Sequence, residues 1–146
     1  MKRRTFVKAS CISCASISFL STLLESCTSV KYVFGELSDN GIFIETSDFL
    51  TKENLYRSYV IVRNRDLKYP ICVYRIDNST YNALYLQCSH QGAELQVSDN
   101  QLACPAHGSE FNKLGHVTKG PAAKNLREFP VQIENEKLFI DLKKKG

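Results

Sequence analysis

Beyond about residue 30, short hydrophobic runs alternate with polar turns along the chain, a pattern typical of β-strands. Each run is five to eight residues long, is rich in β-branched and aromatic side chains, and is bounded by Asn, Asp, Gly or Pro. Only the stretch 47–56 indicates a helical turn, near Thr51, and no long amphipathic helix is expected. The runs cover residues 31–37, 41–47, 58–64, 69–76, 81–88, 100–104, 129–135 and 137–142.

The last two runs give the clearest local prediction. Hydrophobic residues alternate with polar ones on both sides of a polar turn at 134–136, as in a β-hairpin. With no internal repeat and no second domain boundary, the pattern predicts one small all-β domain in which small antiparallel sheets stack on one another. The alternating residues are Val131, Ile133, Leu138, Ile140 and Leu142.

Composition and charge limit what such a domain can do. A chain of 146 residues with 43% hydrophobic content can build one modest core but no separate substrate domain. The formal net charge of +4 falls to +1 from Cys27 onward, where 15 basic residues face 14 acidic ones. No basic patch suited to nucleic acid is left, since the lysines at 143–145 are typical of a solvated tail.

The first 26 residues have the features of an export signal. A basic start precedes mostly small and apolar residues over 9–24, a run shorter than the ~20 residues that a membrane span needs. The segment "KRRTFVK" resembles the twin-arginine export signal, in which paired arginines, here Arg3 and Arg4, precede Phe, an aliphatic residue and Lys. The Ser or Thr usual before the arginines is Lys2 here, and an ordinary basic signal-peptide start is the alternative.

The segment "LLESC" places Leu24 three residues before Cys27 and resembles the site at which bacterial lipoproteins are cleaved and acylated on cysteine. Glu25 is unusual there, and simple cleavage nearby is the alternative. One acyl chain binds a membrane only marginally, and the lipoprotein resemblance implies several chains on Cys27. We therefore expect a signal peptide over 1–26 and a domain over 27–146 that is anchored by lipid to a bacterial membrane on its extracytoplasmic, periplasmic side.

The six cysteines divide by their place in the chain. Cys72 stands in a strand-like run and is interpreted as a small buried side chain. The pair in "CISC" has the spacing of a thiol redox pair but lies in the segment expected to be removed. Cys88 and Cys104 are therefore the candidates for chemistry in the domain. The cysteines of the export segment and its processing site are Cys11, Cys14 and Cys27.

Two short segments, "CSHQGA" from residue 88 and "CPAHGS" from residue 104, each combine a thiol with an imidazole. Cys88 precedes His90 by two residues, and Cys104 precedes His107 by three. Two sulfur and two nitrogen ligands suit either tetrahedral zinc or an iron–sulfur cluster, so ligand type alone leaves both open.

Gly92 and Gly108 follow the two histidines closely. A residue without Cβ lets the backbone come close and direct N–H groups at sulfur. Because a cluster with exposed sulfides uses such donors and a zinc site has less need of them, the glycines favour a cluster over a structural zinc module.

Both segments resemble the cluster-binding loops of Rieske iron–sulfur proteins, and the later segment "GPAAKNL" resembles the loop that covers the cluster in that family. The similarity runs over about residues 80–142. It implies one 2Fe-2S cluster per chain, in which Cys88 and Cys104 would hold the inner iron and His90 and His107 the outer iron, nearer the surface. Two neutral imidazoles in place of two thiolates make such a cluster less negative, which raises its reduction potential.

The resemblance also assigns roles around the two loops. Ser109 matches a serine whose hydroxyl donates to a bridging sulfide and raises the potential, and Pro121 lies in the covering loop. Phe111 stands where high-potential relatives have a tyrosine that donates a hydrogen bond to a cysteine sulfur. Because phenylalanine has no hydroxyl to donate, the expected reduction potential is lower. Ala93 and Ala106 replace two cysteines that form a disulfide in quinol-oxidising Rieske proteins, so this brace between the loops is absent.

Together these features predict one-electron transfer. We expect a membrane-tethered extracytoplasmic carrier that exchanges electrons with a redox protein and has no catalysis of its own. The alternative is a Rieske subunit of a quinol-oxidising or molybdenum-type oxidoreductase complex, and a structural zinc module is a remote one. No small-molecule substrate site is evident. A twin-arginine signal agrees with the cluster, because that route exports folded proteins that already carry their cofactor.

Overall fold

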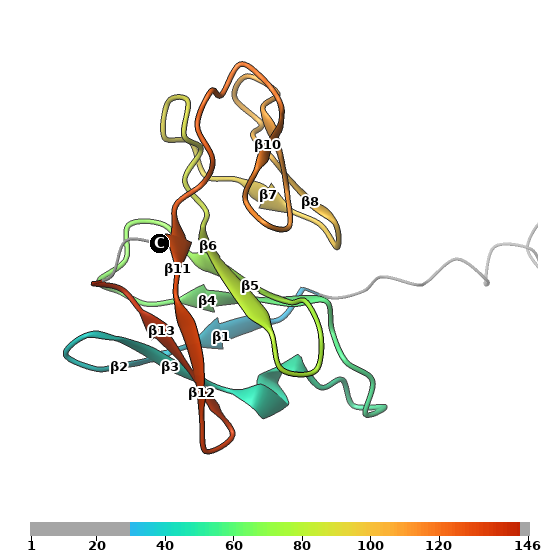
Figure 1. The fold of residues 1–146 in the computed structure, drawn as a ribbon, viewed down its shortest axis with the longest axis vertical. Coiled ribbons are helices and arrows are strands. Elements are labelled where there is room, and N and C mark those ends of the chain that lie inside the picture. The colour runs from blue at the N-terminus through green and yellow to red at the C-terminus, as the bar shows by residue number, and fades with distance from the viewer. Residues whose placement is uncertain (1–29, 144–146) are drawn as a thin grey trace, which may run out of the picture.

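The computed structural model describes residues 30–143, so the predicted signal peptide over 1–26, with Arg3 and Arg4, and the predicted lipidation site Cys27 lie outside the described residues. The described chain forms short strands and one 3-10 helix, η1 (Thr46–Phe49). Figure 1 shows the strands arranged in small stacked sheets, which confirms the predicted all-β class. No helix in the range 30–143 is long and apolar enough to cross a membrane.

The first sheet has five strands in the order β1-β4-β5-β6-β11. Four of them pair antiparallel as predicted, but β1 pairs parallel with β4. Parallel neighbours need a crossover connection, which β2 and β3 of another sheet supply between β1 and β4. The strands are β1 (Tyr32–Phe34), β4 (Tyr59–Arg63), β5 (Ile71–Arg75), β6 (Tyr81–Tyr85) and β11 (Glu128–Phe129).

The second sheet has four strands in the order β12-β13-β3-β2 and contains the predicted hairpin. Val131 pairs with Ile140, and Ile133 pairs with Leu138. The turn places Asn135 and Glu136 at positive φ, the backbone that a tight two-residue hairpin turn requires. The strands are β2 (Glu36–Leu37), β3 (Gly41–Glu45), β12 (Val131–Glu134) and β13 (Lys137–Asp141).

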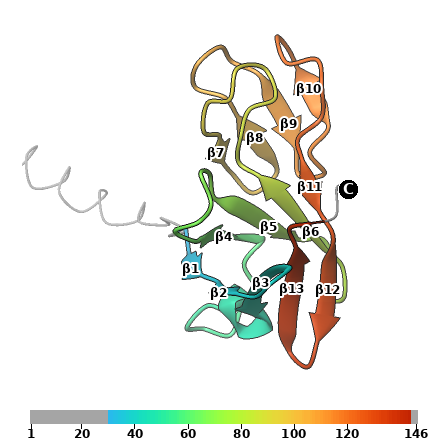
Figure 2. The same cartoon turned by 90° about the vertical axis from the view of Figure 1, so that its left-hand side faces the viewer.

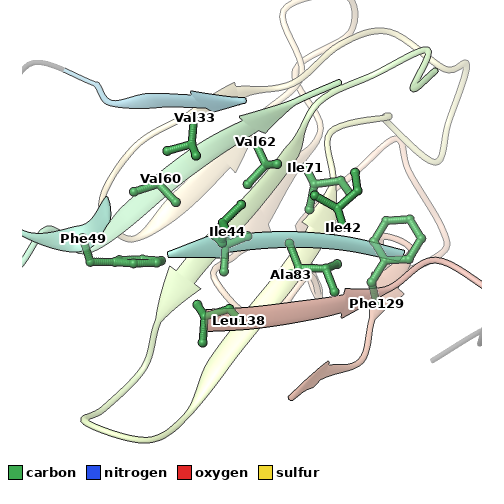
Figure 3. Close-up of a cluster of buried hydrophobic side chains, with 12 residues drawn as sticks. Val33, Ile42, Ile44, Phe49, Val60, Val62, Ile71, Ala83, Phe129 and Leu138 are labelled. Carbon is green, nitrogen blue, oxygen red and sulfur yellow. The ribbon is translucent and has the colours of Figure 1, made fainter. Parts of the chain in front are cut away.

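The main hydrophobic core lies between these two sheets. Figure 3 shows apolar side chains from both sheets meeting there, with Phe49 of η1 at one end. The period-two alternation of the strands places one face of each sheet toward this core. The buried cluster comprises Val33, Ile42, Ile44, Phe49, Val60, Val62, Ile71, Val73, Ala83, Phe129, Leu138 and Ile140.

A third sheet, in the order β10-β9-β8-β7, forms one end of the molecule, as Figures 1 and 2 show. A second hydrophobic cluster, which includes Tyr74, Leu84 and Leu102, packs this sheet against the face of the first sheet that is turned away from the main core. Only β8 coincides with a predicted run, because two or three residues are too short to show a period. The strands are β7 (Gln96–Val97), β8 (Gln101–Ala103), β9 (Glu110–Asn112) and β10 (Val117–Lys119).

The predicted helical turn lies slightly earlier than expected. The 3-10 helix ends at Phe49, whose buried ring anchors it to the core. Around Thr51 the chain instead forms a hydrogen-bonded turn, in which the Asn54 N–H donates to the Thr51 carbonyl. The Thr51 hydroxyl also accepts from the Glu53 and Leu55 N–H groups, a local bond that competes with helix formation.

Candidate metal centre

The two Cys/His segments form neighbouring loops at the end of the third sheet. Cys88 follows β6, and the chain from Cys88 reaches β7 at Gln96. Cys104 directly follows β8, and the second loop ends where β9 begins at Glu110. The first loop is thus the connection from β6 to β7, and the second is the turn between β8 and β9. The fold places these two segments, which are separate in sequence, next to each other.

Both loops close with the same pair of backbone hydrogen bonds. The Gly92 N–H donates to the Cys88 carbonyl at 2.9 Å, and the Cys88 N–H donates to the Ala93 carbonyl at 2.8 Å. The second loop repeats this pattern, since Gly108 donates to Cys104 at 3.0 Å and Cys104 donates to the Ser109 carbonyl at 2.8 Å. The loops are thus equivalent around their cysteines, although their histidines stand at different spacings.

The glycines shape the two loops, and in the second loop backbone N–H groups point at sulfur as predicted. Gly92 and Gly108 have φ values of +77° and +76°, the left-handed conformation that side chains disfavour. Their N–H groups close the loops by donating to the cysteine carbonyls rather than pointing at sulfur. The donors to the Cys104 sulfur are the N–H groups of Ala106 and His107, inside the loop that Gly108 closes.

The structure brings the predicted ligand side chains together in two pairs, the thiols buried and the imidazoles exposed. Among residues 30–143, no group of three or more Cys, His, Asp or Glu side chains is placed to hold a single metal ion. Cys88 and Cys104 are both buried free thiols. His90 and His107 are exposed, and their ring centroids lie 5.2 Å apart with the rings nearly perpendicular, at 88°. Two protected thiols and two solvent-facing imidazoles make an asymmetric donor set with an inner and an outer side.

The surroundings of Cys104 favour its anionic form. Burial raises the pKa of the thiol, but hydrogen bonds from the Ala106 N–H, the Cys88 side chain and the His107 N–H outweigh this effect. The pKa of Cys104 therefore lies below its ordinary value. By contrast, burial strongly raises the pKa of Cys72, which agrees with its interpretation as an inert buried side chain in β5. A thiolate is the form of cysteine that binds metal.

A third loop packs against the first two. Ser109 is buried, and its hydroxyl oxygen accepts a hydrogen bond of 3.0 Å from the Ala122 N–H. Ser89 of the first loop donates to the Lys124 carbonyl at 2.5 Å. Pro121, exposed and following a cis peptide bond, stands in this loop as predicted. Ser109 acts as the acceptor in this bond, which leaves its hydroxyl proton available to donate.

Sequence reasoning missed Tyr69, which supports the first loop from outside. Its hydroxyl donates to the Gly92 carbonyl, and its ring packs edge-on against Tyr85 of β6. The Tyr69 N–H also donates to the Tyr85 hydroxyl at 3.3 Å. No sequence signal marks this residue, since 23 positions separate it from Gly92.

Two further site predictions can be placed in the structure. Phe111 is fully buried in β9, in the same hydrophobic cluster as Cys88 and Cys104. His116 is exposed in the turn between β9 and β10, where its N–H donates to the Asn112 side chain, as expected of a surface turn residue.

Comparison with known proteins decides the family. A model of the Rieske [2Fe-2S] domain matches residues 46–130, more than half of the chain. The chain belongs to the Rieske family. Rieske domains bind a 2Fe-2S cluster, and the donor set found here fits that cofactor, because two thiols and two imidazoles divide into an inner and an outer pair.

Curated relatives share only part of their length with this Rieske chain. It is 35% identical over 68 residues to the chloroplastic cytochrome b6-f complex iron-sulfur subunit of Bigelowiella natans, covering 44% of this chain and 27% of that protein. It is 36% identical over 74 residues to apoptosis-inducing factor 3 of Homo sapiens, covering 48% of this chain and 12% of that protein. The chain thus spans less than a third of these relatives.

Solved structures show the same fold. The plasma membrane Rieske protein of the cyanobacterium Synechocystis PCC 6803 has a TM-score of 0.51 and 24% identity, covering 57% of this chain and 86% of that chain. A chain of a hyperthermophilic respiratory complex III has a TM-score of 0.51 and 19% identity, covering 92% of this chain and 95% of that chain.

Proposed function

We propose that this Rieske protein is a membrane-tethered, extracytoplasmic one-electron carrier. Cys88 and Cys104 bind the inner iron of its 2Fe-2S cluster, and His90 and His107 bind the outer iron. The observation that carries the proposal is the placing of buried thiols and exposed imidazoles on two neighbouring loops. The bound cluster supplies the ability to accept and release a single electron.

The protein's own residues have three tasks in this function. The loop hydrogen bonds hold the two cysteines in equivalent positions, and burial keeps water from their sulfurs. The exposed imidazoles of His90 and His107 define the side from which a redox partner approaches. The third loop, fixed by Ser109 and Ser89, keeps the two metal-binding loops together without a disulfide, since all three cysteines within residues 30–143 are free.

We expect the midpoint potential to fall as pH rises through the alkaline range. A histidine ligand loses its outer ring proton more easily beside the more positive oxidised centre, so the reduced state holds the proton more tightly. Each proton lost only from the oxidised form lowers the midpoint by about 59 mV per pH unit. Because His90 and His107 are exposed, these protons exchange with water.

Protein-film voltammetry across pH 5–11 measures this dependence. His116→Gln serves as the control, since His116 is an exposed histidine outside the two loops, and it should leave the profile unchanged. A midpoint that stays level at alkaline pH would contradict the proposed histidine ligation.

We expect Ser109→Ala to lower the midpoint potential. The substitution removes a hydroxyl that is free to donate to the reduced cluster, and reduction then becomes less favourable. It also leaves the Ala122 N–H without its buried acceptor, at a cost of about 1–3 kcal/mol in stability. Redox titration of Ser109→Ala and of the control Ser98→Ala, whose exposed hydroxyl donates to the Gln101 carbonyl, should show a decrease for the first alone.

The partner is proposed from two lines of support. The loops carry alanines at 93 and 106, where quinol-oxidising Rieske proteins have a disulfide, which favours a carrier. A subunit of an oxidoreductase complex is the second candidate, because relatives are subunits of the cytochrome b6-f complex. A midpoint below about 0 mV would support the carrier, whereas one above about +100 mV with co-purification of a heme or molybdenum protein would support the subunit.

The tether and the location are proposed from the amino-terminal sequence. Arg3 and Arg4 lie in the twin-arginine-like segment, and Cys27 ends the lipoprotein-like "LLESC". Mass spectrometry of the amino-terminal peptide of the membrane-derived protein tests this directly. The proposal predicts a chain that begins at Cys27 with acyl groups attached, and an unmodified Met1 or Cys27 would refute it.

A further inference from the structure

An exposed apolar strip begins at the edge of the first sheet. Val30, Tyr32 and Phe34 alternate along extended chain, so their side chains project to the same side. Phe34 is 80% exposed, and Tyr32 and Val30 are also exposed. Val33, between them, points into the main core.

The strip continues onto the loop that precedes β4. Leu55, which is 66% exposed, and Tyr56 line a groove of about 400 Å³ together with Val30. Among the described residues, five of the eight large exposed hydrophobic side chains belong to this apolar strip, which we define as Val30, Tyr32, Phe34, Leu55 and Tyr56.

An exposed group of neighbouring hydrophobic side chains calls for another surface that covers it. Single exposed hydrophobic residues are normal, but neighbouring ones mark a surface that binds something. The strand concerned, β1, is the outermost of its sheet and leaves its second edge unpaired in that sheet. An exposed apolar edge is prone to aggregation unless another surface covers it.

The distance to the proposed lipid anchor identifies the occupant. Val30 follows Cys27 by three residues, and three fully extended residues reach at most about 11 Å. Val30, where the strip begins, therefore stays close to the lipid headgroups. The strip's two tyrosines suit that region, where an aromatic ring contacts acyl chains and its hydroxyl stays in water. The Arg63 guanidinium lies 4.9 Å from the centre of the Tyr32 ring, which places a cation beside the strip.

We propose that the apolar strip rests on the bilayer and fixes the orientation of the cluster. This inference rests on the proposed acylation of Cys27. Contact through both β1 and the loop with Leu55 prevents rotation about the tether. In Figure 2, β1 lies along one side of the molecule, whereas the third sheet and its loops form one end. With β1 held against the membrane, the third sheet and the exposed imidazoles of His90 and His107 keep one fixed orientation relative to it, as presented to a partner that moves along the membrane.

Orientation-dependent EPR tests the proposal. The full-length, cluster-loaded protein is reconstituted into phosphatidylcholine–phosphatidylglycerol vesicles, which are then dried as oriented multilayers and reduced. The proposal predicts a spectrum that changes with the angle between membrane and magnetic field. The double variant Phe34→Asp/Leu55→Asp should lose most of this change, because two charges disfavour contact with lipid. Both side chains are mainly exposed, so the fold and the solution spectrum should persist.

Ile133→Asp is the matched control. Ile133 is also an exposed aliphatic residue, at 49%, but it lies on β12 of the second sheet, outside the strip. Its substitution should leave the angular dependence unchanged.

Cys27 is analysed by mass spectrometry on the same sample, so failure of the proposed orientation can be told apart from failure of the proposed tether. An acylated protein whose spectrum has no angular dependence, or whose dependence is equal in the double variant, would overturn the inference and leave the tether intact. A Cys27 without acyl groups would overturn both. Self-association that the double variant abolishes would assign the strip to a second copy of the chain and contradict membrane contact.

Discussion

Replacing Cys104 by Ser should abolish the cluster. We expect the iron content to fall from two atoms per chain to near zero, with loss of the EPR signal of the reduced protein. Cys104 is buried, and neighbouring N–H groups lower its pKa and so favour the thiolate that binds metal. A serine hydroxyl does not ionise at neutral pH, and so cannot supply that anion. Cys88→Ser should have the same result, since its loop is equivalent.

Cys72→Ala is the matched control for this experiment. Cys72 is the remaining free cysteine among residues 30–143 and is also buried, but it lies in β5 and not in a cluster loop. The variant should keep two irons and lose only a little stability, from the small cavity in the core. Full iron retention in Cys104→Ser, or loss of iron in Cys72→Ala alone, would contradict the proposed ligands.

Gly41→Ala should strongly destabilise the fold. Gly41 begins β3, and a Cβ added there would lie 2.1 Å from the Ile140 carbonyl oxygen of β13 and 2.7 Å from the Phe139 ring. The backbone oxygen belongs to the neighbouring strand of the sheet, so it cannot move without breaking strand pairing. We expect a loss of about 3 kcal/mol or more, at the upper end for overpacking, measured by denaturant unfolding of the cluster-loaded protein.

Gly120→Ala provides the comparison for Gly41. A Cβ at Gly120 meets nothing within 4 Å, and its φ lies outside the left-handed region. This variant should unfold within about 0.5 kcal/mol of the unsubstituted protein, as surface substitutions usually do. Equal free energies of unfolding for the two variants would mean that β3 and β13 pack less closely than the structure shows.

The two Cys/His loops, proposed to bind the cluster, could be located from sequence because their residue pattern is local. Each loop holds a cysteine, a histidine and a glycine within five residues, so no knowledge of distant contacts is needed to recognise it. The hairpin of β12 and β13 was predictable for the same reason, since alternation and a polar turn are contiguous. Sequence could not show that both loops close with the same hydrogen bonds, because the histidine spacings differ.

Features that depend on packing between distant segments escaped prediction. The bond from Tyr69 to Gly92 and the bond from Ala122 to Ser109 each join residues brought together only by the folded sheets. Strands β7, β9 and β10 are too short for a periodic signal. The alternation around Tyr32 and Phe34 predicted a strand correctly, but only the structure shows that these two aromatic side chains are exposed while Val33 between them is buried.

An EPR-monitored redox titration of the purified protein, with iron, sulfide and zinc quantified on the same sample, tests the central claim most directly. The Rieske assignment predicts two irons and two sulfides per chain, and an EPR signal that appears on one-electron reduction. With Phe111 in place of a tyrosine donor, the midpoint should lie in the lower or middle part of the range of about −150 to +300 mV known for Rieske centres. Zinc in place of iron, with no EPR signal on reduction, would contradict it.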